Sequence, residues 1–301
     1  MKKIIILVSM TFLLFLIGCS SLQSDSFEKE LQGDQLTHVH GMGYDKDGQL
    51  NFGTHAGLKY YKDGKWFETT KNINDYMGFN VVDQGFYTSG HPGAQSDLPN
   101  PIGIQRSLDG GKTLENVGFV GEVDFHLLSV GYESHDIFLY NPKSNSTLDE
   151  GLYLSNSEGE DWKKVSSSSI DGKYIDLAVH PNNSNLLAVT SVGGVYLSED
   201  GGQSFKLLTE RKQGIGVYFT ENTLYYSTFD GSPSLVSYGL KNQEKTVNNL
   251  PELGKDAPMD ISQNPQNPNE LAIHTYSSGD VYLTKDSTKT WTLLSKSGRV
   301  Q

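Results

Sequence analysis

Five of the eight histidines in this 301-residue chain lie within its first 126 residues, at spacings that could bring their side chains together. His38 and His40 are two residues apart, so along a strand both side chains point to one face. His55 and His91 each end a predicted strand, and His126 opens another. Three or four imidazoles suit copper or zinc, and a nearby thioether favours copper.

Three aspartates form a second candidate group. Asp124, Asp176 and Asp260 occupy comparable places near the start of predicted inner strands. Hydrolysis of a glycosidic bond needs two carboxyl groups about 5–10 Å apart, so these three are the candidate catalytic residues. The alternative is that they accept hydrogen bonds from loop amides.

The elements that position these residues follow from an internal repeat. Four eight-residue segments resemble one another and start 48, 43 and 86 residues apart: 107–114, 155–162, 198–205 and 284–291. The last interval is twice the one before, which indicates one degenerate unit between them. Short strand patterns with regular turn signals surround each segment. Six units of about 44 residues then fill residues 36–301.

The four segments resemble the Asp-box, also called the BNR repeat. Its aspartate accepts hydrogen bonds from turn amides, its glycine takes a positive φ, and its last aromatic residue returns to the core. The residues in these roles are Asp109, Asp200 and Asp286, then Gly111 and Gly202, then Trp162, Phe205 and Trp291. Ser157 replaces the aspartate in one segment and Thr288 replaces the glycine in another, so we expect looser turns there.

This resemblance implies an all-β protein, a β-propeller of the sialidase-like and sortilin-like superfamily with six blades rather than seven. Bacterial lipoproteins of this type are often labelled glycosyl hydrolase-like. The predicted blades span 36–70, 75–120, 123–167, 173–210, 214–250 and 257–296.

The innermost strand of each blade lines the central channel of a propeller, so aligning these strands predicts a ring of side chains. The ring contains His40, Met77, His126, Asp176, Gly216 and Asp260. The predicted metal ligands are His40, His55, His91 and His126, with His38 and Met77 as second choices. A polar funnel for an organic ligand is the alternative. His135, His180 and His274 are expected to bond backbone groups or to face solvent.

The arginines argue against a sialidase, whose family holds the substrate carboxylate with three of them. This chain has only Arg106, Arg211 and Arg299. Arg106 directly precedes a repeated segment, Arg211 lies in a predicted connection between blades, and Arg299 is near the C-terminus. Because the planar guanidinium fork is hard to replace, a sialidase is excluded, and any enzyme would be another glycosyl hydrolase-like protein.

The N-terminus indicates an extracytoplasmic protein. Residues 1–18 combine two lysines with an apolar run too short to span a membrane, which predicts a signal peptide. Leu16-Ile17-Gly18-Cys19 resembles the bacterial lipobox, which implies cleavage before Cys19 and lipid on its thiol. Residues 19–35 are then a lipidated cysteine and a flexible tether, and 36–301 a single propeller domain. The expected location is the outer side of the cell membrane.

The net charge of the chain limits the classes of partner that it is expected to bind. A net charge of −12 and a pI near 5.1 argue against nucleic acid and favour a monomer. The leading hypothesis is a cell-envelope binding module that holds a ligand or a metal, Cu or Zn, at its histidine-rich channel mouth. The alternatives are a glycoside hydrolase or lyase acting on an extracellular glycan, and an interaction scaffold for envelope assembly. The partner is a small molecule, a glycan or an envelope protein.

Overall fold

The computed structural model describes residues 26–33, 35–36, 38–210 and 212–301. The predicted signal peptide, Cys19 and Arg211 lie outside these residues, so the leader and its lipid anchor stay predictions. Among the described residues, no helix has both the length and the apolar character needed to cross a membrane.

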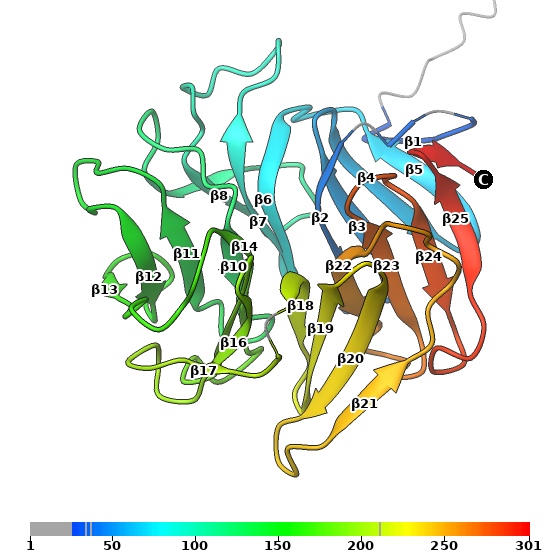
Figure 1. Cartoon of the computed structure of the whole chain (residues 1–301). Coiled ribbons are helices and arrows are strands. Elements are labelled where there is room, and N and C mark those ends of the chain that lie inside the picture. The colour runs from blue at the N-terminus through cyan, green and yellow to red at the C-terminus, as the bar shows by residue number, and fades with distance from the viewer. Residues whose placement is uncertain (1–25, 34, 37, 211) are drawn as a thin grey trace, which may run out of the picture.

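Six antiparallel sheets stand around a central axis, which makes the protein a six-bladed β-propeller (Figure 1). The innermost strand of each sheet contacts the innermost strand of the next, and the last of these contacts the first. All-β architecture with six blades was predicted from the repeat, and the structure confirms it.

The first three blades each begin with their innermost strand. Blade 1 contains β2 (Val39–Tyr44), β3 (Leu50–Thr54), β4 (Gly57–Lys62) and β5 (Lys65–Thr69), with β1 (Glu28–Glu30) added outside β5. Blade 2 contains β6 (Asp75–Val82), β7 (Gly85–His91), β8 (Ile104–Ser107) and β9 (Glu115–Gly118). Blade 3 contains β10 (Leu128–Val130), β11 (Ile137–Asn141), β12 (Gly151–Ser155) and β13 (Lys163–Lys164).

The last three blades repeat this order. Blade 4 contains β14 (Tyr174–Val179), β15 (Leu187–Ser191), β16 (Gly194–Ser198) and β17 (Lys206–Leu207). Blade 5 contains β18 (Gln213–Phe219), β19 (Thr223–Phe229), β20 (Pro233–Gly239) and β21 (Lys245–Asn248). Blade 6 contains β22 (Pro258–Gln263), β23 (Leu271–Thr275), β24 (Val281–Thr284), β25 (Thr292–Lys296) and β26 (Arg299–Val300).

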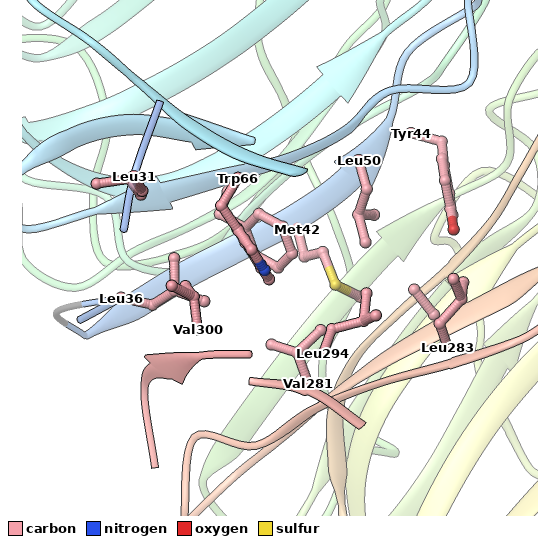
Figure 2. Close-up of a cluster of buried hydrophobic side chains, with 12 residues drawn as sticks. Leu31, Leu36, Met42, Tyr44, Leu50, Trp66, Val281, Leu283, Leu294 and Val300 are labelled. Atoms are coloured by element: carbon pink, nitrogen blue, oxygen red, sulfur yellow. The ribbon is translucent and has the colours of Figure 1, made fainter. Parts of the chain in front are cut away.

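The ring closes by packing between blades 1 and 6. A buried cluster joins the two blades and includes Met42, Trp66, Val281 and Leu294 (Figure 2). The segment between β1 and β2 takes part, because the amide of Leu36 donates a hydrogen bond to the carbonyl of Gly298. Each of these blades is built from its own stretch of chain, since β1 pairs with β5 and β26 pairs with β25.

Part of the segment expected as a flexible tether, residues 28–31, is paired or buried in the structure. Glu28, Lys29 and Glu30 form β1 on the outer edge of blade 1, and Leu31 and Leu36 are 5% exposed in the closing cluster. The segment carries few apolar residues, but these two leucines pack into the buried apolar cluster between blades 1 and 6. Burying a leucine stabilises by roughly 2 kcal/mol, which offsets part of the conformational entropy lost when the segment is ordered against the sheet.

Five of the six innermost strands contain a β-bulge near the start. The pairing register shifts at β2, β6, β14, β18 and β22. A Cβ atom on Gly78 would lie 2.3 Å from the carbonyl oxygen of Phe125, and one on Gly216 would lie 2.0 Å from that of Met259. Glycine therefore lets neighbouring inner strands approach closely, and each bulge re-aims the side chains beside it.

The four repeated segments form turns with a shared hydrogen-bond pattern. In one of them Asp200 accepts from both the amide and the hydroxyl of Ser204, while Ser198 accepts from the amide of Gly202. Asp109 and Asp286 make the equivalent bonds, and Thr288 fits the glycine position with a φ of 64°. The aromatic ends differ in burial: Phe205 is buried, whereas Trp162 and Trp291 are half-buried.

Candidate functional site

A cavity of about 620 Å³ lies at the centre of the ring. His40, His126, Asp176 and Asp260 line it, as the strand alignment predicted. In blades 2 and 5 the alignment was wrong by one residue. The register shift runs from Met77 to Asn80 and from Gly214 to Val217 in these blades, and is longer than the shifts in blades 4 and 6, whose inner strands align directly. The lining begins at Gly78 in blade 2 and at Val217 in blade 5, one residue after the predicted Met77 and Gly216, which are not among the lining residues.

Strand direction brings the histidines to one rim of this cavity. Innermost strands begin at this rim, and antiparallel second strands return to it, so His40 lies near the start of β2 while His55 directly follows β3. His91 ends β7 at the same rim. Third strands end at the opposite rim, where the four repeated turns follow.

His55 stacks against two other imidazoles. Its ring centroid lies 4.7 Å from that of His38 and 4.6 Å from that of His40, with interplanar angles of 5° and 20°. His38 has a φ of 44°, a conformation that non-glycine residues adopt rarely. These stacked rings hold His40 and His55 side by side at the rim.

Asp75, which the sequence analysis did not select, completes this group. Single ligand atoms of His40, His55 and Asp75 all lie within 4.8 Å of one another. His55 Nε2 is 3.7 Å from Asp75 Oδ1, too far for a hydrogen bond. Among the described residues, neither His40 Nε2 nor Asp75 Oδ1 has a hydrogen-bond partner, although both atoms are buried.

A second group lies beside the first. Asp124 Oδ2 is 3.2 Å from His91 Nε2 and 3.3 Å from His126 Nδ1. Across the β6–β7 ladder His91 pairs directly with Asp75, which links the two groups. In the loop 92–101, which follows β7, Asn100 Oδ1 lies 2.7 Å from His91 Nδ1.

Burial and charge set the protonation of the first group. Burial, reinforced by the imidazoles of His55 and His126, lowers the pKa of His40 to about 4. At pH 7 its ring is therefore neutral and carries a free lone pair. Burial raises the pKa of Asp75, opposed by the adjacent His55.

The two remaining aspartate candidates lie on the cavity wall, where Asp260 is near enough to His40 to oppose the lowering of its pKa. Burial raises the pKa of Asp176 well above its ordinary value, and the neighbouring Asp260 raises it further. Asp176 accepts hydrogen bonds from the amides of Leu177 and Val217. Asp260 Oδ2 lies 2.7 Å from His274 Nδ1.

Of the other three histidines, one makes the contact that we expected and two make different contacts. His180 Nε2 is 3.0 Å from the carbonyl oxygen of Glu221, a backbone bond between blades as expected. His135 instead pairs with Asp83, at 2.7 Å. The expectation for His274 was wrong, because it lines the cavity and pairs with Asp260. The signal was available in register, since the two residues face each other across β22 and β23.

The described arginines lie away from the cavity. Arg106 forms ion pairs with Glu115 and Glu158, and Arg299 lies in β26 at the outer edge of blade 6. Neither of these two arginines is among the residues that line the cavity.

No protein-family model and no curated protein sequence matches the chain. Solved structures do show similarity. A GH74 xyloglucanase from Xanthomonas campestris is 16% identical with a TM-score of 0.55, over 89% of this chain and 46% of that one. A GH74 enzyme from Niastella koreensis is 17% identical with a TM-score of 0.56, over 89% and 47%. This chain thus spans about half the length of those enzymes.

YCF48 bound to a D1 peptide is 16% identical with a TM-score of 0.51, over 90% of this chain and 84% of that one. At these identities the likeness shows the β-propeller fold alone.

Proposed function

We propose that the protein is a metal-binding β-propeller that holds a divalent transition metal ion at its channel rim through His40, His55 and Asp75. The observation that carries this proposal is the pair of buried atoms, His40 Nε2 and Asp75 Oδ1, without a hydrogen-bond partner among the described residues. Buried polar groups are almost always satisfied, and an ion is one way to satisfy them.

The geometry of the trio supports the same proposal. Ligands at about 2.1 Å in a tetrahedron lie roughly 3.4 Å apart, so donors within 4.8 Å need only a small inward movement. The distance of 3.7 Å between His55 Nε2 and Asp75 Oδ1 suits two ligands of one ion better than a hydrogen bond.

The donor set favours zinc. Two imidazoles and one carboxylate with an open fourth position are typical of zinc sites that bind a water molecule or a substrate. The thioether that favoured copper came from Met77, which is buried and lies outside the cavity lining. Copper(II), which also binds imidazole, is the second choice.

The test is metal titration of the protein, purified without a histidine tag and stripped with a chelator. We expect stoichiometric Zn(II), bound tighter than about 1 μM, and a loss of this ion in His40→Ala. His180→Ala is the matched control, because this imidazole bonds a backbone carbonyl between blades and lies outside the trio. Binding weaker than micromolar, or unchanged binding in His40→Ala, would contradict the proposal.

A second candidate function is glycoside hydrolysis, favoured by the neighbouring carboxyl groups of Asp176 and Asp260 on the cavity wall. A carboxyl group with a raised pKa beside another carboxylate resembles the acid and base of a glycosidase. The likeness to GH74 enzymes agrees with this candidate at the level of fold. We place it second because backbone amides already satisfy Asp176 and His274 already pairs with Asp260.

The cellular setting is proposed from sequence alone. The leader and Cys19 support a lipid-anchored protein on the extracytoplasmic face of the membrane, and the four repeated turns support membership of the Asp-box propellers. The metal site would then face a compartment outside the cytoplasm.

A further inference from the structure

We propose that the protein binds a small planar organic anion, an aromatic carboxylate, in a second cavity beside the central one. This side cavity has a volume of about 490 Å³, within the range of pockets that hold small organic ligands. It adjoins the central cavity, since Leu127, Ile175 and Met259 line both. The proposal does not depend on metal binding, because none of the three proposed metal ligands is among the residues that line the side cavity.

The wall of the side cavity is mainly apolar and aromatic. Eight of the twelve residues that line it are of these kinds, and three of the eight are tyrosines from different blades: Tyr140, Tyr174 and Tyr276. The ring centroids of Tyr140 and Tyr174 lie 5.1 Å apart with an interplanar angle of 77°. One ring thus turns its edge to the face of the other, and such a pair leaves further aromatic surface against which a planar ring can pack.

Two large apolar side chains at the side cavity are exposed although their backbone is held in place. Tyr276 is 60% exposed and Val192 is 55% exposed. The carboxylate of Asp256 accepts hydrogen bonds from the two amides that follow Tyr276, at 2.8 and 2.7 Å. The amide of Val192 donates to the carbonyl of Lys173. Exposed apolar groups on a fixed backbone favour a binding surface, because little entropy is lost in ordering them around a ligand.

Lys173 supplies the charge that favours an anion. It lines the side cavity, and its ammonium has no ion-pair partner among the described residues, whereas Lys206 pairs with Glu199. The cavity also contains Asp124, but Oδ2 of this carboxylate already faces two imidazole nitrogens, at 3.2 and 3.3 Å. A carboxylate on the ligand can therefore pair with Lys173 while its ring lies against the tyrosines.

The test is titration of the metal-free protein with 2-naphthoate, a two-ring aromatic carboxylate, followed by ligand-observed nuclear magnetic resonance. We expect saturable binding with a Kd below about 1 mM. Tyr276→Ala should weaken it about tenfold, because an aromatic contact is lost. The matched control is Leu108→Ala, since Leu108 is 46% exposed in a repeated turn at the opposite rim, and it should bind as the parent does. Circular dichroism verifies that each variant is folded.

The neutral amide 2-naphthamide tests the charge, because it has the shape of 2-naphthoate without its negative charge. We expect Lys173→Gln to weaken 2-naphthoate about two- to fivefold and to leave 2-naphthamide unchanged. Lys289→Gln is the matched control, since Lys289 is an exposed lysine in the repeated turn of blade 6, and it should change the affinity for neither compound.

Three outcomes would overturn this proposal. The first is no saturable binding of 2-naphthoate below about 1 mM, or equal binding by the parent and Tyr276→Ala. The second is a preference for 2-naphthamide, or an equal loss of both compounds in Lys173→Gln. The third is binding of the neutral sugar cellotetraose in place of 2-naphthoate. Because the protein is free of metal in these titrations, each outcome leaves the proposed zinc site untouched.

Discussion

His55 is the residue that connects the rim, since it stacks on two imidazoles and faces Asp75. A histidine in such a stack has a restricted ring orientation, so less entropy is lost when it binds an ion. Met77, by contrast, is not among the residues that line the cavity. It lies in the strand next to Gly78, which takes the cavity-lining place that the alignment had assigned to the methionine.

Met77→Leu tests this placement at the level of one residue. Leucine nearly conserves the volume, so we expect the fold to persist and the affinity for Zn(II) and Cu(I) to stay within about twofold of the parent. The measurement is competition against a chromophoric chelator, with His40→Ala as the reference for loss. A selective loss of Cu(I) affinity would contradict this placement and show that Met77 is a metal ligand.

At the scale of an element, one carboxylate in each repeated turn accepts the hydrogen bonds that hold the turn together. In three turns the aspartate accepts from the amide and the hydroxyl of the residue four positions later. In the blade 3 turn Ser157 keeps only the amide bond, to Asp161. The expected loosening thus appears in this turn as fewer hydrogen bonds.

The double variant Ser157→Asp/Asp161→Thr should restore the missing bond between the carboxylate and the hydroxyl four positions later. We expect its Tm to rise by about 2 °C, because one hydrogen bond to a charged group is regained. Ser157→Asp alone places two carboxylates together and should not raise the Tm. Differential scanning calorimetry measures the Tm of the parent and both variants. Equal Tm values for all three proteins would contradict this prediction.

At the scale of the whole molecule, stability depends on the seam between blades 1 and 6 (Figure 2). A ring with an open seam would expose apolar faces of two sheets, so the segment carrying Leu31 and Leu36 matters beyond its length. It lies against the C-terminal hairpin, as the Leu36–Gly298 hydrogen bond shows.

Leu36→Ala should lower the free energy of unfolding by about 2–4 kcal/mol, because it leaves a cavity in a packed seam. The control is Leu207→Ala, at a position that is 43% exposed, which should change stability by about 0.5 kcal/mol or less. Urea denaturation measures both. If the two variants unfold alike, the seam does not govern the stability of the ring.

The repeat, the six blades and the rim shared by His40, His55, His91 and His126 could all be predicted from the sequence. These features are local: alternating strands and turn residues recur every 44 residues or so, and strand direction assigns each histidine to an end. Expected and observed blades therefore agree closely.

Only the tertiary structure selected Asp75, paired His274 with Asp260 and exchanged Met77 for Gly78 at the cavity wall. Bulges insert residues into the inner strands, and a shift of one residue reverses which side chain faces the channel. Distances between residues on different blades depend on how the ring closes, and the pattern within one repeat carries no information about that.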